Sequence, residues 1–250
     1  MLSIEEIKSR LNENGFTVDE IKEKIDELYM PEISKRYIVN SDYELIVYED
    51  DIEDIVKLNN YVSENIPGVI DKPLYADNHI YMKKIEKINR FKLSLYNEMS
   101  EEEKNEFSKA LSDTYEKIHS LEIPDFAKDI NPSQNKKAIC IGPFNLFNIK
   151  IKGNKFDGFI SPFVSIDDPD YDYSFVVDSK YNDISKRMFK KSKLDFLRLK
   201  NEILILKDDT SHSDYFSLPE SYIEAKKKEL EAKEFQFSLL LEKNNKKIKK

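Results

Sequence analysis

Residues 138–173 have the sequence AICIGPFNLFNIKIKGNKFDGFISPFVSIDDPDYDY, in which short apolar segments alternate with turn residues and end in an acidic cluster. Gly153 and Asn154 separate two of these segments and are typical of a hairpin turn. Three apolar segments have the length and composition of buried strands: Ala138–Ile141, Phe147–Ile151 and Phe156–Ile160. The stretch therefore predicts a small β-platform placed after helices.

Taken in order, these residues resemble the central loops of the aminoglycoside phosphotransferase and choline kinase group, small-molecule kinases built on the protein-kinase fold. In that group a His-Gly-Asp motif lies five residues ahead of an Asn, a hairpin then ends in a metal-binding Asp, and Asp-Pro-x-x-Asp closes the run. Here Gly142 lies in the first motif and Asn148 follows at the expected distance. Asp168 and Asp172 match the closing motif, and residues 115–124 (YEKIHSLEIP) are similar to the helix end that leads into the catalytic loop of that group.

Two departures from the family pattern fall on the positions that would carry the chemistry. Phosphoryl transfer needs one carboxylate to orient and deprotonate the attacking hydroxyl, and another to hold the magnesium ion. Pro143 and Ser161 stand at these positions. Proline cannot transfer a proton, and serine is a poor magnesium ligand beside a carboxylate. The resemblance therefore implies a kinase-like fold without its catalytic groups, for which we expect no catalytic residue, no bound metal and no other cofactor.

The resemblance implies an α+β, two-lobed, protein-kinase-like fold whose C-terminal lobe is larger and rich in helices. Residues 1–88 are the predicted N-terminal lobe, with two short helices, a small antiparallel sheet and one further helix. Residues 89–250 are the predicted C-terminal lobe, which contains the β-platform at 138–161 and ends in a long helix.

Local signals place the elements of both lobes. The patterns Ser3-x-x-Glu6 and Thr17-x-x-Glu20 are capping boxes that predict helices from residue 4 and over 17–28. Residues 37–39 and 43–48 alternate as the strands of a hairpin. Further along the chain the patterns predict a strand at 79–85 and helices at 51–64, 100–124, 173–191, 192–206 and 219–244.

The resemblance also implies a phosphate-covering loop in the first hairpin and a lysine in the next strand. The hairpin at 37–48 contains no glycine that would let backbone amides close on a phosphate. The segment at 44–48 contains no lysine. The sequence therefore does not identify which residues would bind a nucleotide.

Asp168 and Asp172 have two interpretations. In the kinase fold an acid at this place accepts hydrogen bonds from the backbone of the catalytic loop and fixes its shape, which is a scaffold role that a non-catalytic chain would keep. Alternatively, both acids begin a helix, where capping and the helix dipole favour them. A calcium loop fits less well, because the run lacks a central glycine and a distal glutamate in register.

The composition excludes several classes of protein. With 250 residues, of which 40% are apolar and 35% charged, the chain is expected to be a soluble globular protein of one or two domains. A formal net charge of −8 argues against general binding to nucleic acid or anionic membrane. No apolar run approaches the ~20 residues that span a bilayer. Acidic residues near the N-terminus argue against a secretory signal, so we expect a cytoplasmic protein.

Cysteine and histidine usage points to no metal centre. Cys140 is the single cysteine and is expected to be a small buried side chain. His79, His119 and His212 are far apart and have no Cys or His at metal-ligand spacing. No zinc site is therefore predicted.

Three functions are compatible with these patterns. The first is a non-catalytic kinase-like protein (a pseudokinase) that acts as a binding, regulatory or assembly component. The second is an active small-molecule phosphotransferase in which Asp167, Asp168 or Asp170 replaces the lost acids and ATP and Mg²⁺ are the cofactors. The third is a mostly helical structural or interaction protein unrelated to kinases. We expect protein partners, with the C-terminal helix as the binding surface.

Overall fold

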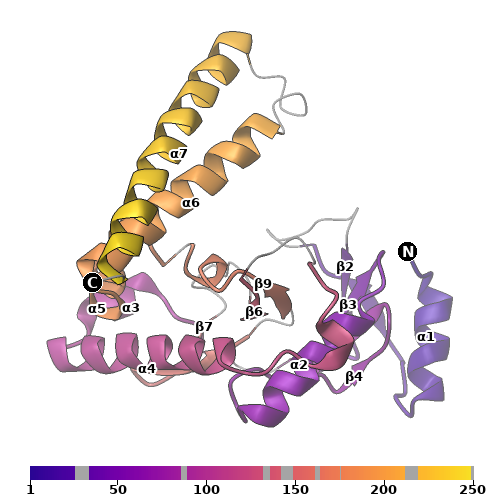
Figure 1. Cartoon of the computed structure of the whole chain (residues 1–250). Helices are drawn as coiled ribbons and strands as arrows, with labels where there is room; N and C mark the ends of the chain where they lie inside the picture. Colours follow the sequence, from indigo (N-terminus) through magenta and orange to yellow (C-terminus); the bar gives the residue numbers. More distant parts are fainter. Residues whose placement is uncertain are drawn as a thin grey trace.

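The computed structural model describes residues 1–25, 34–85, 89–131, 136–141, 149–160, 164–174, 176–211 and 219–248. Within these ranges the chain forms a lobe built on a β-sheet, followed by a lobe made mostly of helices (Figure 1). The predicted two-lobed α+β architecture is confirmed.

The N-terminal lobe contains a five-stranded antiparallel sheet. Its strands lie in the order β1-β2-β3-β5-β4. Their bounds are β1 Ile21–Glu23, β2 Ser34–Val39, β3 Tyr43–Tyr48, β4 Tyr75–Ala76 and β5 Ile80–Lys84. Val39 pairs with Tyr43, so residues 40–42 form the turn of the β2–β3 hairpin that the sequence predicts.

Helices cover both faces of this sheet, as the alternation along its strands requires. Helix α1 (Ile4–Glu13) begins at the predicted Ser3–Glu6 capping box and buries Ile7 and Leu11 against one face. The side chains of that face are Tyr37, Val39, Leu45, Val47, Ile80 and Met82. On the other face, Ile46, Tyr48 and Tyr81 pack with residues at the start of α2 (Glu53–Asn65).

The helix predicted at 17–28 is wrong, because Ile21–Glu23 is strand β1. Ile21 pairs with Val39 across the sheet. The Asn40 side chain accepts hydrogen bonds from the backbone N–H groups of Asp19 and Glu20 and donates to the carbonyl of Thr17. This long-range pairing uses the amides that a capping box would have bound, so tertiary context overrides the local helix signal. Residues 26–28 of the predicted helix lie outside the described residues.

The core of the C-terminal lobe surrounds α4 (Glu101–His119). The helix begins at the predicted Ser100–Glu103 capping box and follows the short helix α3 (Leu93–Glu98). Its buried face carries the predicted residues Phe107, Leu111, Tyr115 and Ile118. A single 3₁₀ turn, η1 (Asp125–Ala127), comes next.

The predicted β-platform is two separate two-stranded sheets. Strands β7 (Ile149–Lys152) and β8 (Lys155–Phe159) form the expected hairpin. Strand β6 (Ala138–Cys140) pairs instead with β9 (Ser165–Asp167). The sequence did not predict β9 because it has only one apolar residue, Ile166, among its three.

Strands β7 and β8 also bind the segment that follows α2. The Phe159 backbone N–H donates to the Val69 carbonyl, and Lys150 forms an ion pair with Asp71. Gly158 comes so close that a Cβ atom there would lie 2.6 Å from the Gly68 carbonyl oxygen. This segment therefore joins the two lobes through backbone contacts and an ion pair.

The helix predicted at 173–191 is mostly not formed. The chain makes two 3₁₀ turns, η3 (Tyr171–Tyr173) and η4 (Ser179–Tyr181), before the short helix α5 (Asn182–Met188). The Asp178 side chain accepts a hydrogen bond from the Lys180 backbone N–H. Such an Asx turn competes with continuation of a helix.

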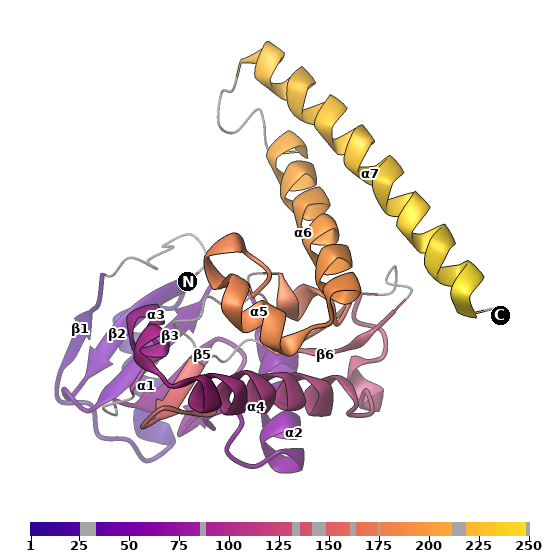
Figure 2. The ribbon, with the colours of Figure 1, turned by 90° about the vertical axis from the view of Figure 1, so that its left-hand side faces the viewer.

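The chain ends in a helical hairpin made of α6 (Lys191–Ser211) and α7 (Glu220–Ile248), which projects from the rest of the molecule in both views (Figures 1 and 2). Phe237 of α7 packs on Phe196 of α6, with ring centroids 5.0 Å apart. By contrast, Phe235 is 67% exposed and Leu239 is 43% exposed. The predicted apolar half of α7 is therefore only partly covered. None of the described helices is both long enough and apolar enough to cross a membrane.

Candidate functional site

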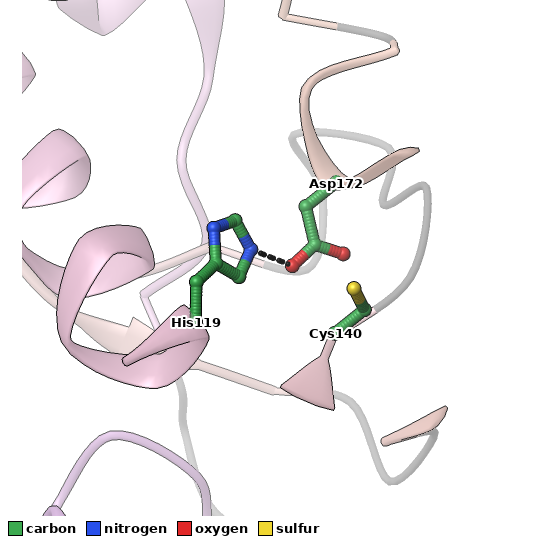
Figure 3. Close-up of side chains that lie close together, drawn as sticks. All are labelled: His119, Cys140 and Asp172. Carbon is green, nitrogen blue, oxygen red and sulfur yellow. Dashed lines mark hydrogen bonds and ion pairs between the residues drawn. The ribbon is translucent and has the colours of Figure 1, made fainter. Parts of the chain in front are cut away.

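Asp172 is fully buried in η3, at a point where three elements meet (Figure 3). Its Oδ2 atom accepts a hydrogen bond from the backbone N–H of Ile141, at 3.1 Å. The same oxygen lies 2.8 Å from Nε2 of His119, the last residue of α4. The acid thus contacts the backbone directly after β6.

Burial favours the neutral forms of Cys140, Tyr115 and Tyr173, which lie around Asp172. Burial, and then the charge of Asp172, raise the pKa of the Cys140 thiol and of the Tyr115 hydroxyl. The same two causes raise the pKa of Tyr173. Because a nucleophilic cysteine must ionise, Cys140 does not act as one in this environment.

Asp168 and Asp170 are bound by lysines from α6. Lys200 Nζ lies 2.6 Å from Asp168 Oδ2 and 3.0 Å from Asp170 Oδ2. Lys193 Nζ lies 2.6 Å from Asp170 Oδ1. Burial alone would raise the pKa of Asp170, but the hydrogen bonds and charges of Lys193 and Lys200 hold it below its usual range. Asp170 therefore stays ionised, and both aspartates already have cationic partners.

Four family-motif positions lie outside the described residues, namely Gly142, Pro143, Asn148 and Ser161. Their proposed roles stay predictions. Asp168 and Asp172 are described and lie in one segment, but they face different partners.

Sequence reasoning missed the partners of these acids. His119 lies inside the 115–124 stretch that resembles the family, so that likeness could have singled it out. Lys193 and Lys200 are seven residues apart and share one face of α6. No pattern in the neighbouring sequence indicates that this face of α6 contacts the aspartates.

The N-terminal sheet has an earlier hairpin than the one in which the sequence places the phosphate-covering loop. Because β1 pairs with β2, the hairpin at 37–48 is the second of the sheet, and taking it for the first hairpin is wrong. The first connection runs over residues 24–33, most of which lie outside the described residues. The strand that follows the first hairpin is β3, which has no lysine.

A buried carboxylate, Glu44, lies on the face of the sheet that α2 partly covers. Its carboxylate is 2.8 Å from Lys24 Nζ, 3.2 Å from Lys83 Nζ and 3.7 Å from an Arg36 guanidinium nitrogen. Burial raises the pKa of Glu44, but the charges and hydrogen bonds of Lys83 and Lys24 outweigh burial and set it at about 2. Three cations thus surround one carboxylate at this end of the sheet.

A pocket of about 470 Å³ opens beside the Asp172 cluster. His119 and Tyr173 line it on one side, and Asp170, Lys193 and Phe189 also contribute. Concave sites in which titratable groups converge are common places for ligands.

Comparisons of the fold with known structures decide its class. The aminoglycoside phosphotransferase APH(2'')-Ib bound to ADP superposes with a TM-score of 0.66 and 16% identity, over 91% of this chain and 97% of that chain. The streptomycin–ATP complex of APH(2'')-IIa gives a TM-score of 0.61 and 16% identity, over 83% and 89%. This chain has an aminoglycoside-phosphotransferase-like fold.

A macrolide 2'-phosphotransferase of type I shares this phosphotransferase-like fold, with a TM-score of 0.54 and 10% identity over 92% of this chain and 98% of that chain. No protein-family model and no curated protein sequence matches the chain. At these identities the likeness establishes the kinase-like fold and nothing about activity.

Proposed function

We propose that this protein is a non-catalytic, kinase-like protein that acts as a binding, regulatory or assembly component. The observation that carries the proposal is that lysines of α6 bind Asp168 and Asp170. These are the acids that would have to replace the missing catalytic carboxylates.

The chemistry of phosphoryl transfer explains why these ion pairs matter. A magnesium ligand and a catalytic base both need a carboxylate oxygen that faces the substrates. Lys200 bridges Asp168 and Asp170, and Asp167 Oδ1 accepts a hydrogen bond from the Asp168 backbone N–H at 2.7 Å. All three candidate acids thus take part in local contacts, while Pro143 and Ser161 stand at the family positions.

The contact between Asp172 and Ile141 supports a retained scaffold. It ties η3 to the start of the segment that resembles the catalytic loop. A chain that keeps this contact while it lacks the catalytic acids fits a protein that uses the shape of the fold rather than its reaction. The kinase-like fold also argues against the third hypothesis, which is a helical protein unrelated to kinases.

Nucleotide binding and turnover test the proposal directly. The thermal stability of the full-length protein is measured with and without millimolar ATP, each with and without Mg²⁺. ATP hydrolysis, and phosphoryl transfer to a panel of aminoglycosides and macrolides, are measured separately. We expect no Mg²⁺-dependent turnover. A stability rise with ATP but without turnover would support a nucleotide-binding, non-catalytic protein, because a ligand that binds only the folded state stabilises it.

An active phosphotransferase would behave differently. Its Mg²⁺-dependent turnover would disappear in Asp168→Asn or Asp170→Asn. It would persist in Asp113→Asn, a matched control whose carboxylate forms an exposed ion pair with Lys109 on α4. That pattern would overturn the proposal and establish the rival with ATP and Mg²⁺ as cofactors.

For a protein partner, we propose the exposed apolar side chains of α7 as the contact. Phe235, Leu239 and Leu241 are exposed in the C-terminal half of α7. Cross-linking of full-length protein in an extract of its own cells is compared between the parent, Phe235→Ser and the control Lys228→Ser. We expect cross-linked partners that Phe235→Ser loses and Lys228→Ser keeps. Identical patterns in all three would count against this surface.

A further inference from the structure

Three metal-binding side chains from three elements meet at the Asp172 cluster. They are His119 from the end of α4, Cys140 from β6 and Asp172 from η3 (Figure 3). One ligand atom of each lies within 4.8 Å of the other two. The residues are far apart in sequence, so only the fold brings them together.

The buried hydroxyl of Tyr115 is a second and independent sign of a ligand. Among the described residues this hydroxyl has no hydrogen-bond partner, although the side chain is fully buried. Its ring contacts those of His119 and Tyr173, with centroid distances of 6.0 and 5.2 Å. A buried hydroxyl without a partner is costly, and a water bound to a metal ion would supply the partner.

The surroundings of His119 suit a metal ligand. While Nε2 faces the cluster, Nδ1 lies 3.5 Å from the Tyr173 hydroxyl. Metal-bound histidines are usually oriented by such a contact on the other ring nitrogen. His119 is 12% exposed and lines the pocket of about 470 Å³, which gives an ion a route to the cluster.

We propose that His119, Cys140 and Asp172 form a binding site for Zn²⁺, with the fourth position taken by water beside Tyr115. The N, S and O donors are those that zinc accepts, whereas Mg²⁺ and Ca²⁺ prefer oxygen donors alone. A thiolate and a carboxylate together neutralise a divalent ion, so the loaded site is uncharged in a buried position. Zinc bonds of about 2.0 to 2.3 Å place tetrahedral donors roughly 3.3 to 3.8 Å apart. The His119 and Asp172 donor atoms, now 2.8 Å apart, must therefore separate slightly to admit the ion.

The binding step balances in protons. The hydrogen bond between His119 and Asp172 is replaced by one bond from each residue to the ion. The Cys140 thiol releases one proton to solvent. The ring proton of His119 moves by exchange with solvent from Nε2, which donates to Asp172 in the empty site, to Nδ1, which faces Tyr173, so that the Nε2 lone pair can bind the ion. The loaded site would tie α4, β6 and η3 together beside Ile141.

Cobalt substitution tests the site specifically, because the chain has only one cysteine. Chelator-treated full-length protein is titrated with Co²⁺, which gives a thiolate-to-metal charge-transfer band only when sulfur is bound. We expect this band to grow to one equivalent and to disappear when Zn²⁺ is added. Any such band must come from Cys140.

Variants distinguish metal binding at the site from an effect of losing the hydrogen bond between His119 and Asp172. Cys140→Ser should lose the band, and His119→Gln, whose side-chain amide still donates to Asp172, should lose or strongly weaken it. Tyr173→Phe should weaken Zn²⁺ binding about tenfold. His79→Gln, a control at a histidine that contacts the Asp50 carbonyl, should change nothing. If Cys140→Ser does not fold, His119→Gln decides the result.

Two outcomes would overturn the inference. One is the absence of a charge-transfer band in folded parent protein saturated with Co²⁺. The other is a band that persists undiminished in His119→Gln. Neither outcome bears on nucleotide turnover, so this inference and the proposed function fail independently.

Discussion

The ammonium group of Lys200 lies 2.6 Å from a carboxylate oxygen of Asp168, and both side chains are only 22% exposed. The same ammonium also reaches Asp170 at 3.0 Å. A lysine on α6 thus bridges two acids of the segment that closes the kinase-like motif. This links the helical hairpin α6–α7 to the part of the fold around Asp172.

Replacing Lys200 with methionine should destabilise the protein by about 1 to 3 kcal/mol, because it leaves two mostly buried carboxylates with less compensation. The control is Lys207→Met, which removes an ion pair with Glu234 whose two side chains are 55% and 46% exposed. Exposed pairs contribute about 0 to 1 kcal/mol, so the control should change stability little. Urea unfolding of both variants measures the difference, and equal losses would show that Lys200 has no special role.

Glu44 predicts a pH dependence of stability. Its pKa is lowered from 4.5 to about 2 in the folded protein. The ionised form is therefore favoured by folding, and its contribution is fully present above about pH 4.5 and is lost as the pH falls toward 2. The shift corresponds to a stabilisation on the order of 3 kcal/mol.

Glu44→Gln tests this contribution by comparison with the parent protein. The difference in unfolding free energy between the two should be largest at pH 6 and should narrow at pH 3, since Glu44 is then protonated in the unfolded chain while it stays mostly ionised in the folded protein. Glu49→Gln is the control, because this acid is half exposed and pairs with the N-terminal amino group. If the difference in unfolding free energy between the parent and Glu44→Gln stays constant from pH 6 to pH 3, the ion cluster does not lower the pKa of Glu44.

The sequence was most informative where a signal is local or where a family motif is ordered along the chain. The capping boxes at Ser3 and Ser100 begin α1 and α4 as predicted, and the Gly153–Asn154 turn forms the β7–β8 hairpin. The two-lobed fold followed from the order of the motif from Gly142 to Asp172. These features depend on neighbours in sequence, which is why pattern reasoning found them.

The sequence was least informative where distant groups decide the outcome. Thr17–Glu20 looks like a helix start, but the side chain of Asn40 binds the amides of Asp19 and Glu20. The cluster of His119, Cys140 and Asp172 has no regular spacing, so a search for metal-ligand spacing did not reveal it. The lysine partners of Asp168 and Asp170 come from a helix more than twenty residues away.

Gly158 should tolerate no side chain. It has φ of +112°, and an added Cβ would lie 2.6 Å from the Gly68 carbonyl oxygen and 2.9 Å from the Val69 carbonyl oxygen. Because both neighbours are backbone atoms, Gly158→Ala should cost about 2 to 4 kcal/mol through displacement of the contact between the lobes. Gly153→Ala is the matched control, since its φ is +61° and nothing lies within 4 Å of the added atom. The control should lose only about 1 kcal/mol, and similar losses in thermal unfolding would show that the close contact is unimportant.

Asp172→Ala should release the backbone that follows β6. The substitution removes the acceptor of the Ile141 N–H and the partner of His119 Nε2, so a buried donor is left without its acceptor. A loss of about 2 to 4 kcal/mol is expected for two buried hydrogen bonds to a carboxylate. Amide hydrogen exchange gives the specific readout, because exchange at Ile141 should become faster by more than the loss of global stability explains. Asp178→Ala is the control, as that side chain is partly exposed and accepts from the Lys180 backbone. If Ile141 exchanges at the same rate in both variants, Asp172 does not hold this segment in place, and the scaffold role proposed for it is wrong.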